Sequence, residues 1–212
     1  YCYELTTVTL PESVTNIGSS AFQGCRRLVE FKFPKNVTTI EDSLFSSCDK
    51  LKQVTLPKKI TKIGNNAFAS TSISNFTVPA SVKSLGSGAF WSCRKLETVV
   101  IDAQLTEIGD NTFNGCSSLK QITLPDSVLH IGASAFTSTR IKKIDLVAVR
   151  TIGSNAFSYC KYLPSVAIPG SVRSLGDEAF AYCPVLAGAS FEGNAPTMGK
   201  YVFKRAAHGF KI

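Results

Sequence analysis

Apolar residues recur along the chain at a nearly constant spacing of 21 to 23 residues. The spacing is clearest in one position that is held in turn by Phe22, Phe45, Phe68, Phe90, Phe113, Phe136, Phe157, Phe180 and Phe203. Around these phenylalanines runs one pattern, roughly L-P-x-S-V-x-x-I-G-x-x-A-F-x-x-C-x-x-L-x-x-V-x. Self-similarity at such a period is typical of a solenoid, in which each copy buries its apolar side against the next.

Within one copy, the pattern predicts a strand followed by two kinds of turn. Leu51, Val54 and Leu56 belong to an apolar–polar alternation, which favours a strand with one buried face. Proline then ends the strand, because it has no N–H for a neighbouring strand. The Val-x-x-Ile-Gly segment is expected to turn the chain, with glycine at positive φ. Since Ala-Phe-x-x-Cys is too short for a full helix, we expect a helical or 3₁₀ turn there.

Stacked copies predict parallel strands about 4.8 Å apart. They are expected near residues 8–10, 31–33, 54–56, 76–78, 99–101, 122–124, 144–146, 166–168 and 189–191, with a short closing strand at 210–212. The predicted fold is a β-rich α/β solenoid: a right-handed leucine-rich-repeat superhelix with a parallel β-sheet on one face and short helical or 3₁₀ turns opposite.

Two copies and both ends depart from the pattern. Where Thr71 or Thr139 replaces the cysteine, one residue is lost before the next apolar position. Cys2 lies one period before Cys25, so the repeat array, residues 1–191, starts within a repeat, and Tyr1 is not expected to be a native N-terminus. Residues 192–212 are interpreted as a degenerate C-terminal repeat or cap.

Composition narrows the possible functions. The chain has 212 residues, 44% of them hydrophobic, and a net charge of +8. The apolar content excludes a wholly disordered chain, and no apolar run reaches the roughly 18 residues that a membrane span needs. Two histidines in the sequence leave little room for His-based catalysis or a His-rich metal site. We expect no cofactor and no metal, and the chain is predicted not to be an enzyme.

The repeat resembles a known family. The strings from Leu10 to Cys25, Leu56 to Leu96 and Leu124 to Cys160 are similar to BspA-like leucine-rich repeats, and Gly193–Pro196 is similar to the end segment of bacterial arrays of this kind. The resemblance implies export or attachment at a cell surface, and adhesion to host matrix proteins or to other cells. It implies no catalytic residues.

All seven cysteines occupy one position of the repeat: Cys2, Cys25, Cys48, Cys93, Cys116, Cys160 and Cys183. No Cys-x-x-Cys pair occurs, so neither zinc binding nor thioredoxin-like chemistry is indicated. We expect a column of buried free thiols rather than disulfides, since buried cysteine is common without a bridge.

Polar residues of the strands define the first candidate binding surface, because solenoids commonly bind partners on their sheet. Its members are Lys32, Lys52, Gln53, Thr55, Asn75, Thr77, Glu97, Lys120, Gln121, Thr123, Lys142, Lys143 and Asp145. They are equally consistent with a solvated sheet face that binds nothing.

A second surface is a basic rim, opposed by Glu4 and Asp49, at the positions between the cysteine and the leucine. It comprises Arg26, Arg27, Lys50, Arg94, Lys95, Arg140 and Lys161. Such a row can attract a polyanion, or simply keep the solenoid soluble. Exposed aromatic residues are a third candidate contact. They are predicted at Trp91, Tyr159, Tyr162, Tyr182 and Tyr201.

The resulting hypothesis is a secreted or cell-surface binding module whose partner is a protein or glycan of the host matrix or of another cell. One alternative is a rigid spacer within a longer surface protein. The other is a sulfated-glycan binder that uses the basic rim. No specific nucleic acid partner is expected, and a monomer is the default expectation.

Overall fold

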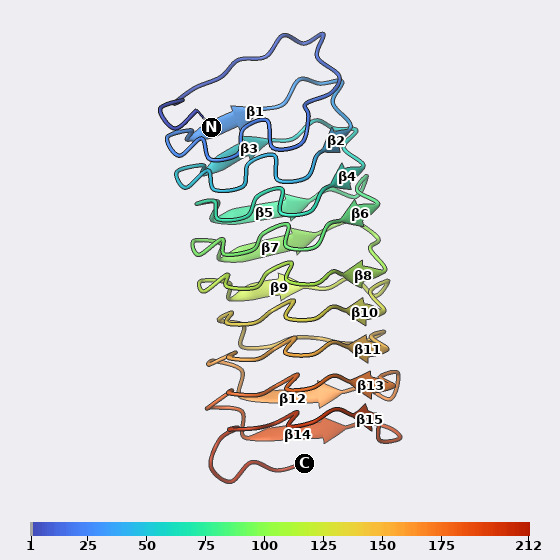
Figure 1. Ribbon diagram of the computed structural model, residues 1–212. Coiled ribbons are helices and arrows are strands. Elements are labelled where there is room, and N and C mark those ends of the chain that lie inside the picture. Colours follow the sequence, from blue (N-terminus) through green and yellow to red (C-terminus); the bar gives the residue numbers. More distant parts are fainter. Residues whose placement is uncertain (1) are drawn as a thin grey trace.

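The computed structural model describes residues 2–212 as a solenoid in which each copy of the repeat forms one rung (Figure 1). Two series of short parallel strands run along the stack, one on the long side of each rung and one at the corner that follows it (Figure 1). Tyr1, where the predicted array begins within a repeat, lies outside the described residues.

The first series forms the predicted sheet. Its strands are β1 (Glu30–Lys32), β3 (Gln53–Thr55), β5 (Asn75–Val78), β7 (Thr98–Ile101), β9 (Gln121–Thr123), β12 (Ser165–Ile168) and β14 (Gly188–Phe191). All pair in parallel, in the register that the repeat period predicts. Three expected strands differ: residues 8–10 and 144–146 form none, and 210–212 contributes only a bridge from Lys211 to Gly188.

The second series was not predicted. Its strands are β2 (Thr39–Ile40), β4 (Lys62–Ile63), β6 (Ser84–Leu85), β8 (Glu107–Ile108), β10 (His130–Ile131), β11 (Thr151–Ile152), β13 (Ser174–Leu175) and β15 (Thr197–Met198). They occupy the Val-x-x-Ile segment that was expected to be a simple turn. Each strand has only two residues, which is too short for an apolar–polar alternation to show in the sequence.

The expected helical or 3₁₀ turns are absent: residues 2–212 contain no helix. In the rung of Phe45, the N–H groups of residues 43, 45 and 47 donate to carbonyls of the next rung, each at 2.8 Å. The residues between them donate their N–H groups within the rung, to the carbonyl three residues earlier, as Ser46 does to Ser43. A helix needs every N–H for its own turn, so donation to the neighbouring rung excludes it.

This alternation places two positions of nearly every rung, two residues before and two after the phenylalanine, in the left-handed region. The non-glycine residues at these positions have φ between 52° and 62°. Most are Ser or Asn, residues that tolerate this conformation relatively well.

The phenylalanine column forms the centre of the core. The nine rings stack from Phe22 to Phe203 with centroids 5.0–5.7 Å apart and planes within 18° of parallel. The seven interior rings are fully buried, surrounded by the Leu, Val, Ile and Cys columns. Phe203 extends the stack into residues 192–212, whose role as a cap stays a prediction.

The glycine after the isoleucine serves a different purpose from the one predicted. Glycines at this position do not have positive φ. Instead, a Cβ on Gly132 would lie 2.5 Å from the backbone nitrogen of Asp110 in the preceding rung, and one on Gly153 would lie 2.6 Å from that of Ala133. Gly132 and Gly153 therefore have to be glycine, because two backbones approach closely at these corners.

Both shortened repeats coincide with breaks in the first sheet. After the residue lost beside Thr71, β3 and β5 do not pair, and after the one lost beside Thr139, residues 144–146 form no strand between β9 and β12. The core continues through both places, since Phe68 and Phe136 stack on both of their neighbours. A lost residue thus alters the surface of the stack without interrupting its interior.

Replacing an interior ring should destabilise the solenoid. We expect Phe113→Ala to lower the free energy of unfolding by about 3–5 kcal/mol, because the cavity lies within a fully buried stack. Phe22→Ala, at the partly exposed end of the stack, should cost less. Urea unfolding followed by circular dichroism measures both, and equal losses would contradict a stack whose interior carries the stability.

The glycine corner gives a second prediction. Gly132→Ala should lower stability by about 1–3 kcal/mol, because the methyl group meets backbone that cannot move aside. Gly18→Ala is the matched control, since nothing lies within 4 Å of its Cβ, and it should be neutral or stabilising by up to about 1 kcal/mol. Similar thermal unfolding midpoints for the two variants would refute the close-approach explanation.

Candidate functional site

The predicted lysines of the sheet are all exposed but do not form one cluster. Lys120, Lys142 and Lys143 lie on adjacent rungs and, with Thr98, Gln121 and neighbouring residues, line a shallow hollow on the sheet. Lys120 pairs with Glu97 at 3.1 Å, and Lys143 with Asp145 at 2.9 Å.

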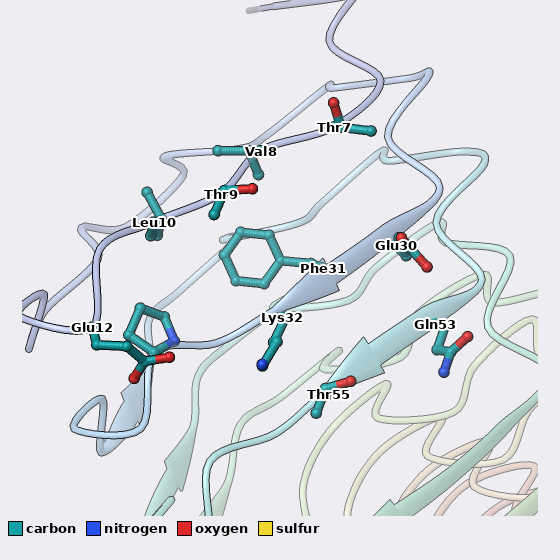
Figure 2. Close-up of a pocket in the computed structure, with 11 residues that line it drawn as sticks. Thr7, Val8, Thr9, Leu10, Glu12, Glu30, Phe31, Lys32, Gln53 and Thr55 are labelled. Atoms are coloured by element: carbon teal, nitrogen blue, oxygen red, sulfur yellow. The ribbon is translucent and has the colours of Figure 1, made fainter.

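Lys32 and Lys52 lie toward the N-terminal end, where Lys32 lines a different hollow, of about 440 Å³ (Figure 2). This hollow separates residues 7–10 from β1, and Phe31 lies between them (Figure 2). Phe31 packs on Phe22 and Phe45 with ring centroids 5.0 and 4.8 Å apart. Phe31 is buried, and residues 8–10 form no strand beside it.

The basic rim is exposed but is not a uniform row of charge. At its N-terminal end Arg27 pairs with Glu4 at 2.7 Å and Arg26 with Asp49 at 3.7 Å. Farther along, Arg140 lies over the ring of Tyr162 at 4.7 Å and donates to its hydroxyl at 2.8 Å. Arg94 and Lys95, between these places, have no ion-pair partner in residues 2–212. Arg26 and Arg27 are thus the two rim residues that form ion pairs in the part of the chain that the structure describes.

The predicted tyrosines divide into two groups. Tyr162 belongs to the rim, whereas Tyr159 and the half-buried Tyr182 stack on each other at 4.6 Å with nearly parallel rings. Lys204 and Arg205 lie over the Tyr182 ring at 5.6 and 5.5 Å. Tyr159 and Tyr182 occupy the left-handed position two residues after the phenylalanine, with φ of 59° and 58°, where earlier rungs carry Ser or Gly. Bulky residues are rare in this conformation.

The sequence did not reveal these left-handed columns or their change of composition along the stack. The signal in the sequence was the recurrence of Ser, Asn and Gly two residues before and two after the first six phenylalanines, Phe22 to Phe136. Neither did it show that the shortened repeat at Thr71 leaves a notch in the rim, lined by Trp91, Arg94 and Lys95.

Six cysteines are buried, as predicted, and Cys2 at the open end is exposed. Five of the buried thiols donate to the carbonyl of the phenylalanine one rung earlier, at 3.0–3.3 Å. They are Cys48, Cys93, Cys116, Cys160 and Cys183. Burial raises the pKa of Cys48 and Cys160 to about 12 and that of Cys93 and Cys183 to about 11. Thiols held protonated at neutral pH are structural rather than nucleophilic.

The described residues 2–212 hold no group of three His, Cys, Asp or Glu side chains that could bind a metal ion. They also include no helix of the length and hydrophobicity that a membrane span requires. His130 is exposed, and its Nδ1 lies 2.8 Å from Thr151 Oγ1 on the neighbouring strand.

Parallel rungs around a Leu- and Phe-lined core, with a parallel sheet along one side, define a solenoid of the leucine-rich-repeat class. The chain belongs to the BspA-type leucine-rich repeat family: the family model, a region of six copies, matches residues 1–97 and 83–208. Repeat proteins of this class are generally non-enzymatic. No curated protein sequence matches the chain significantly.

Solved bacterial proteins share the fold. A leucine-rich repeat protein from Bacteroides ovatus is 26% identical with a TM-score of 0.70, and the match covers 96% of this chain and 53% of that one. A leucine rich cell surface protein from Faecalibacterium prausnitzii is 27% identical with a TM-score of 0.55, over 91% and 67% of the two chains. The pneumococcal vaccine antigen PcpA, at 18% identity and a TM-score of 0.53 over 92% and 74% of the chains, is similar in fold alone. The chain thus spans about half the length of the Bacteroides protein.

The raised thiol pKa values predict a loss of stability at alkaline pH. The unfolded chain releases its thiol protons near pH 8.5, whereas the folded chain retains them, so rising pH favours unfolding. Between about pH 8 and pH 9.5, each of the four thiols with a pKa of about 11 or 12 should lower the free energy of unfolding by about 1 kcal/mol. Urea titrations at the two pH values measure this loss.

Cys116→Ala is the matched control, because burial raises the pKa of that thiol well above its usual value. The variant should lose about 1 kcal/mol less than the parent over the same pH interval. If both proteins show the same pH dependence, the buried thiols do not cause it.

Proposed function

We propose that the chain is a non-enzymatic binding module of an exported, surface-displayed protein, and that it adheres to a protein of the host matrix or of another cell through its sheet face. The proposal rests chiefly on one observation. The register of β7 and β9 aligns exposed polar side chains on adjacent rungs, and Lys120, Lys142 and Lys143 line one shallow hollow beside them. Membership of the BspA-type family and the similarity to a leucine rich cell surface protein support a place at the cell surface.

The chemistry of the hollow favours an acidic protein surface as the partner. Thr98 and Gln121 offer hydrogen bonds beside three lysines, and the exposed Val100 on the next column offers apolar contact. A shallow, mixed surface of this kind suits a macromolecule better than a small ligand, which requires an enclosed pocket. Lys120 and Lys143 would exchange their present partners, Glu97 and Asp145, for carboxylates of the partner.

A rigid spacer is the second candidate function, favoured by the unbroken stack from Phe22 to Phe203. A spacer requires stiffness and tolerates changes on every face. Binding experiments therefore separate the two functions.

The test measures binding of the purified chain to immobilised matrix proteins and to host cells at low salt and at about 0.15 M salt. We expect saturable binding at both, and a loss of about tenfold or more in the variant with Lys120→Gln, Lys142→Gln and Lys143→Gln. The control carries the same loss of charge directly before strands β6, β11 and β13 of the second series, as Lys83→Gln, Arg150→Gln and Arg173→Gln, and should bind normally. Equal losses in both variants would indicate nonspecific attraction, and no binding to any surface would favour the spacer.

A further inference from the structure

The rim contains two notches, one at each shortened repeat. In complete repeats two residues separate the cysteine from the leucine, whereas only Ser72 follows Thr71 and only Arg140 follows Thr139. At the second notch the long Arg140 side chain fills the gap by lying on Tyr162 of the next rung. At the first notch Ser72 is too short to do so, and a hollow of about 440 Å³ remains. The two places share one backbone defect and differ in whether a side chain fills it.

The open notch has an aromatic wall. Trp91 is 45% exposed and makes no ring contact in residues 2–212. Its counterpart in the preceding rung is the buried Ala69, so no bulky side chain stacks on the indole from that side. An exposed indole beside a hollow offers a flat apolar face with a polar N–H at its edge.

The floor of the notch is rich in hydroxyl groups. Ser70, Ser72 and Ser92 line it, while Thr71 is turned inward toward the Cys93 thiol. The Ser72 hydroxyl donates to the carbonyl of Asp49 at 2.6 Å and can accept a further hydrogen bond. The N–H groups of Ser70 and Ser72 donate to the Trp91 and Leu51 carbonyls at 2.7 and 2.9 Å, so these two donors are not available to a ligand.

Charge at the notch is net positive. Arg94 and Lys95 line it and have no ion-pair partner in the described chain. One carboxylate, that of Asp49, also lines the notch, and it pairs with Arg26 at 3.7 Å. Guanidinium and ammonium groups that have not been neutralised bind sulfate or carboxylate oxygens by charge-assisted hydrogen bonds.

We propose that this notch, formed by Ser70, Ser72, Trp91, Ser92, Arg94 and Lys95, is a binding site for an acidic saccharide. A sugar ring lies against the indole of Trp91, its hydroxyl groups bond the serines, and its sulfate or carboxylate group meets Arg94 and Lys95. This site lies on the rim, apart from the sheet hollow that carries the proposed adhesion function, so either proposal can fail without the other.

The test uses the fact that Trp91 is the one tryptophan of the chain, so that fluorescence excited selectively at tryptophan, beyond the tyrosine absorption band, reports on the notch. A heparin-derived hexasaccharide, titrated at about 0.15 M salt, should produce a saturable change in emission. The desulfated hexasaccharide should bind about tenfold more weakly or worse. Calorimetry on the same samples gives affinities for variants that lack the indole.

Four variants locate the site. Trp91→Ala and the Arg94→Gln, Lys95→Gln pair should each weaken binding by about tenfold or more, and Trp91→Phe should retain a measurable part of the affinity. Arg26→Gln with Arg27→Gln removes equal charge from the same rim at ion-paired positions, and should stay within about twofold of the parent. Urea unfolding confirms that each variant is folded.

Three results would overturn the proposal. One is binding that weakens equally in both double variants, which indicates diffuse attraction along the rim. Another is a polyglutamate peptide that binds as tightly as the hexasaccharide and perturbs Trp91 equally, which would assign the notch to acidic proteins. The third is the absence of any saturable fluorescence change at physiological salt.

Discussion

Every feature of this molecule depends on one constraint, the requirement that equivalent positions of successive rungs lie about one strand spacing apart. Phenylalanine rings satisfy it by stacking at 5.0–5.7 Å, and main-chain groups satisfy it by bonding to the next rung on three sides. The cysteines connect the two systems, because each of five thiols donates to the carbonyl of a phenylalanine one rung earlier. A side chain at these positions must therefore fit its own rung and its neighbour simultaneously, which explains why the pattern is so strict there.

The sequence was sufficient to predict what this constraint makes periodic. The phenylalanine column, the buried cysteines and most strands of the first sheet follow from the repeat alone. The sequence was not sufficient where the main chain of a short segment can form hydrogen bonds either within its own rung or to a neighbouring rung. Thr39–Ile40 and its equivalents form a second series of strands, and the segment around Phe45 donates outward instead of forming a helical turn. Which neighbour accepts a given N–H depends on the distance between rungs, a property of the stack that is invisible in one copy. The same holds for glycine, whose role at Gly132 is set by the backbone of Asp110.

Candidate binding residues were harder to predict. The repeat shows which side chains are exposed, but it does not show which of them lie together or what they pair with. All the predicted lysines and arginines are exposed, yet their charges have different partners. Arg27 is neutralised by Glu4 and Arg140 lies on Tyr162, whereas Arg94 is unpaired. These differences arise because the residues that face each charge in the adjacent rung vary from one copy of the repeat to the next. A row of like charges in the sequence therefore becomes a set of chemically distinct places in the structure.

A perfectly regular solenoid presents the same surface at every rung and has no means to specify one ligand over another at one place. Specificity has to come from departures from the repeat, and this chain concentrates its departures at a few positions. The residue lost beside Thr71 leaves a gap in the rim next to Trp91, whereas the Arg140 side chain fills the gap left by the residue lost beside Thr139. Toward the C-terminal end, left-handed positions change from serine to Tyr159 and Tyr182, which accept an unfavourable backbone conformation and stack on each other. Backbone strain that glycine would relieve tends to be retained where a side chain is needed for function. The core, which tolerates the lost residues without a break, is what allows the surface to vary in this way.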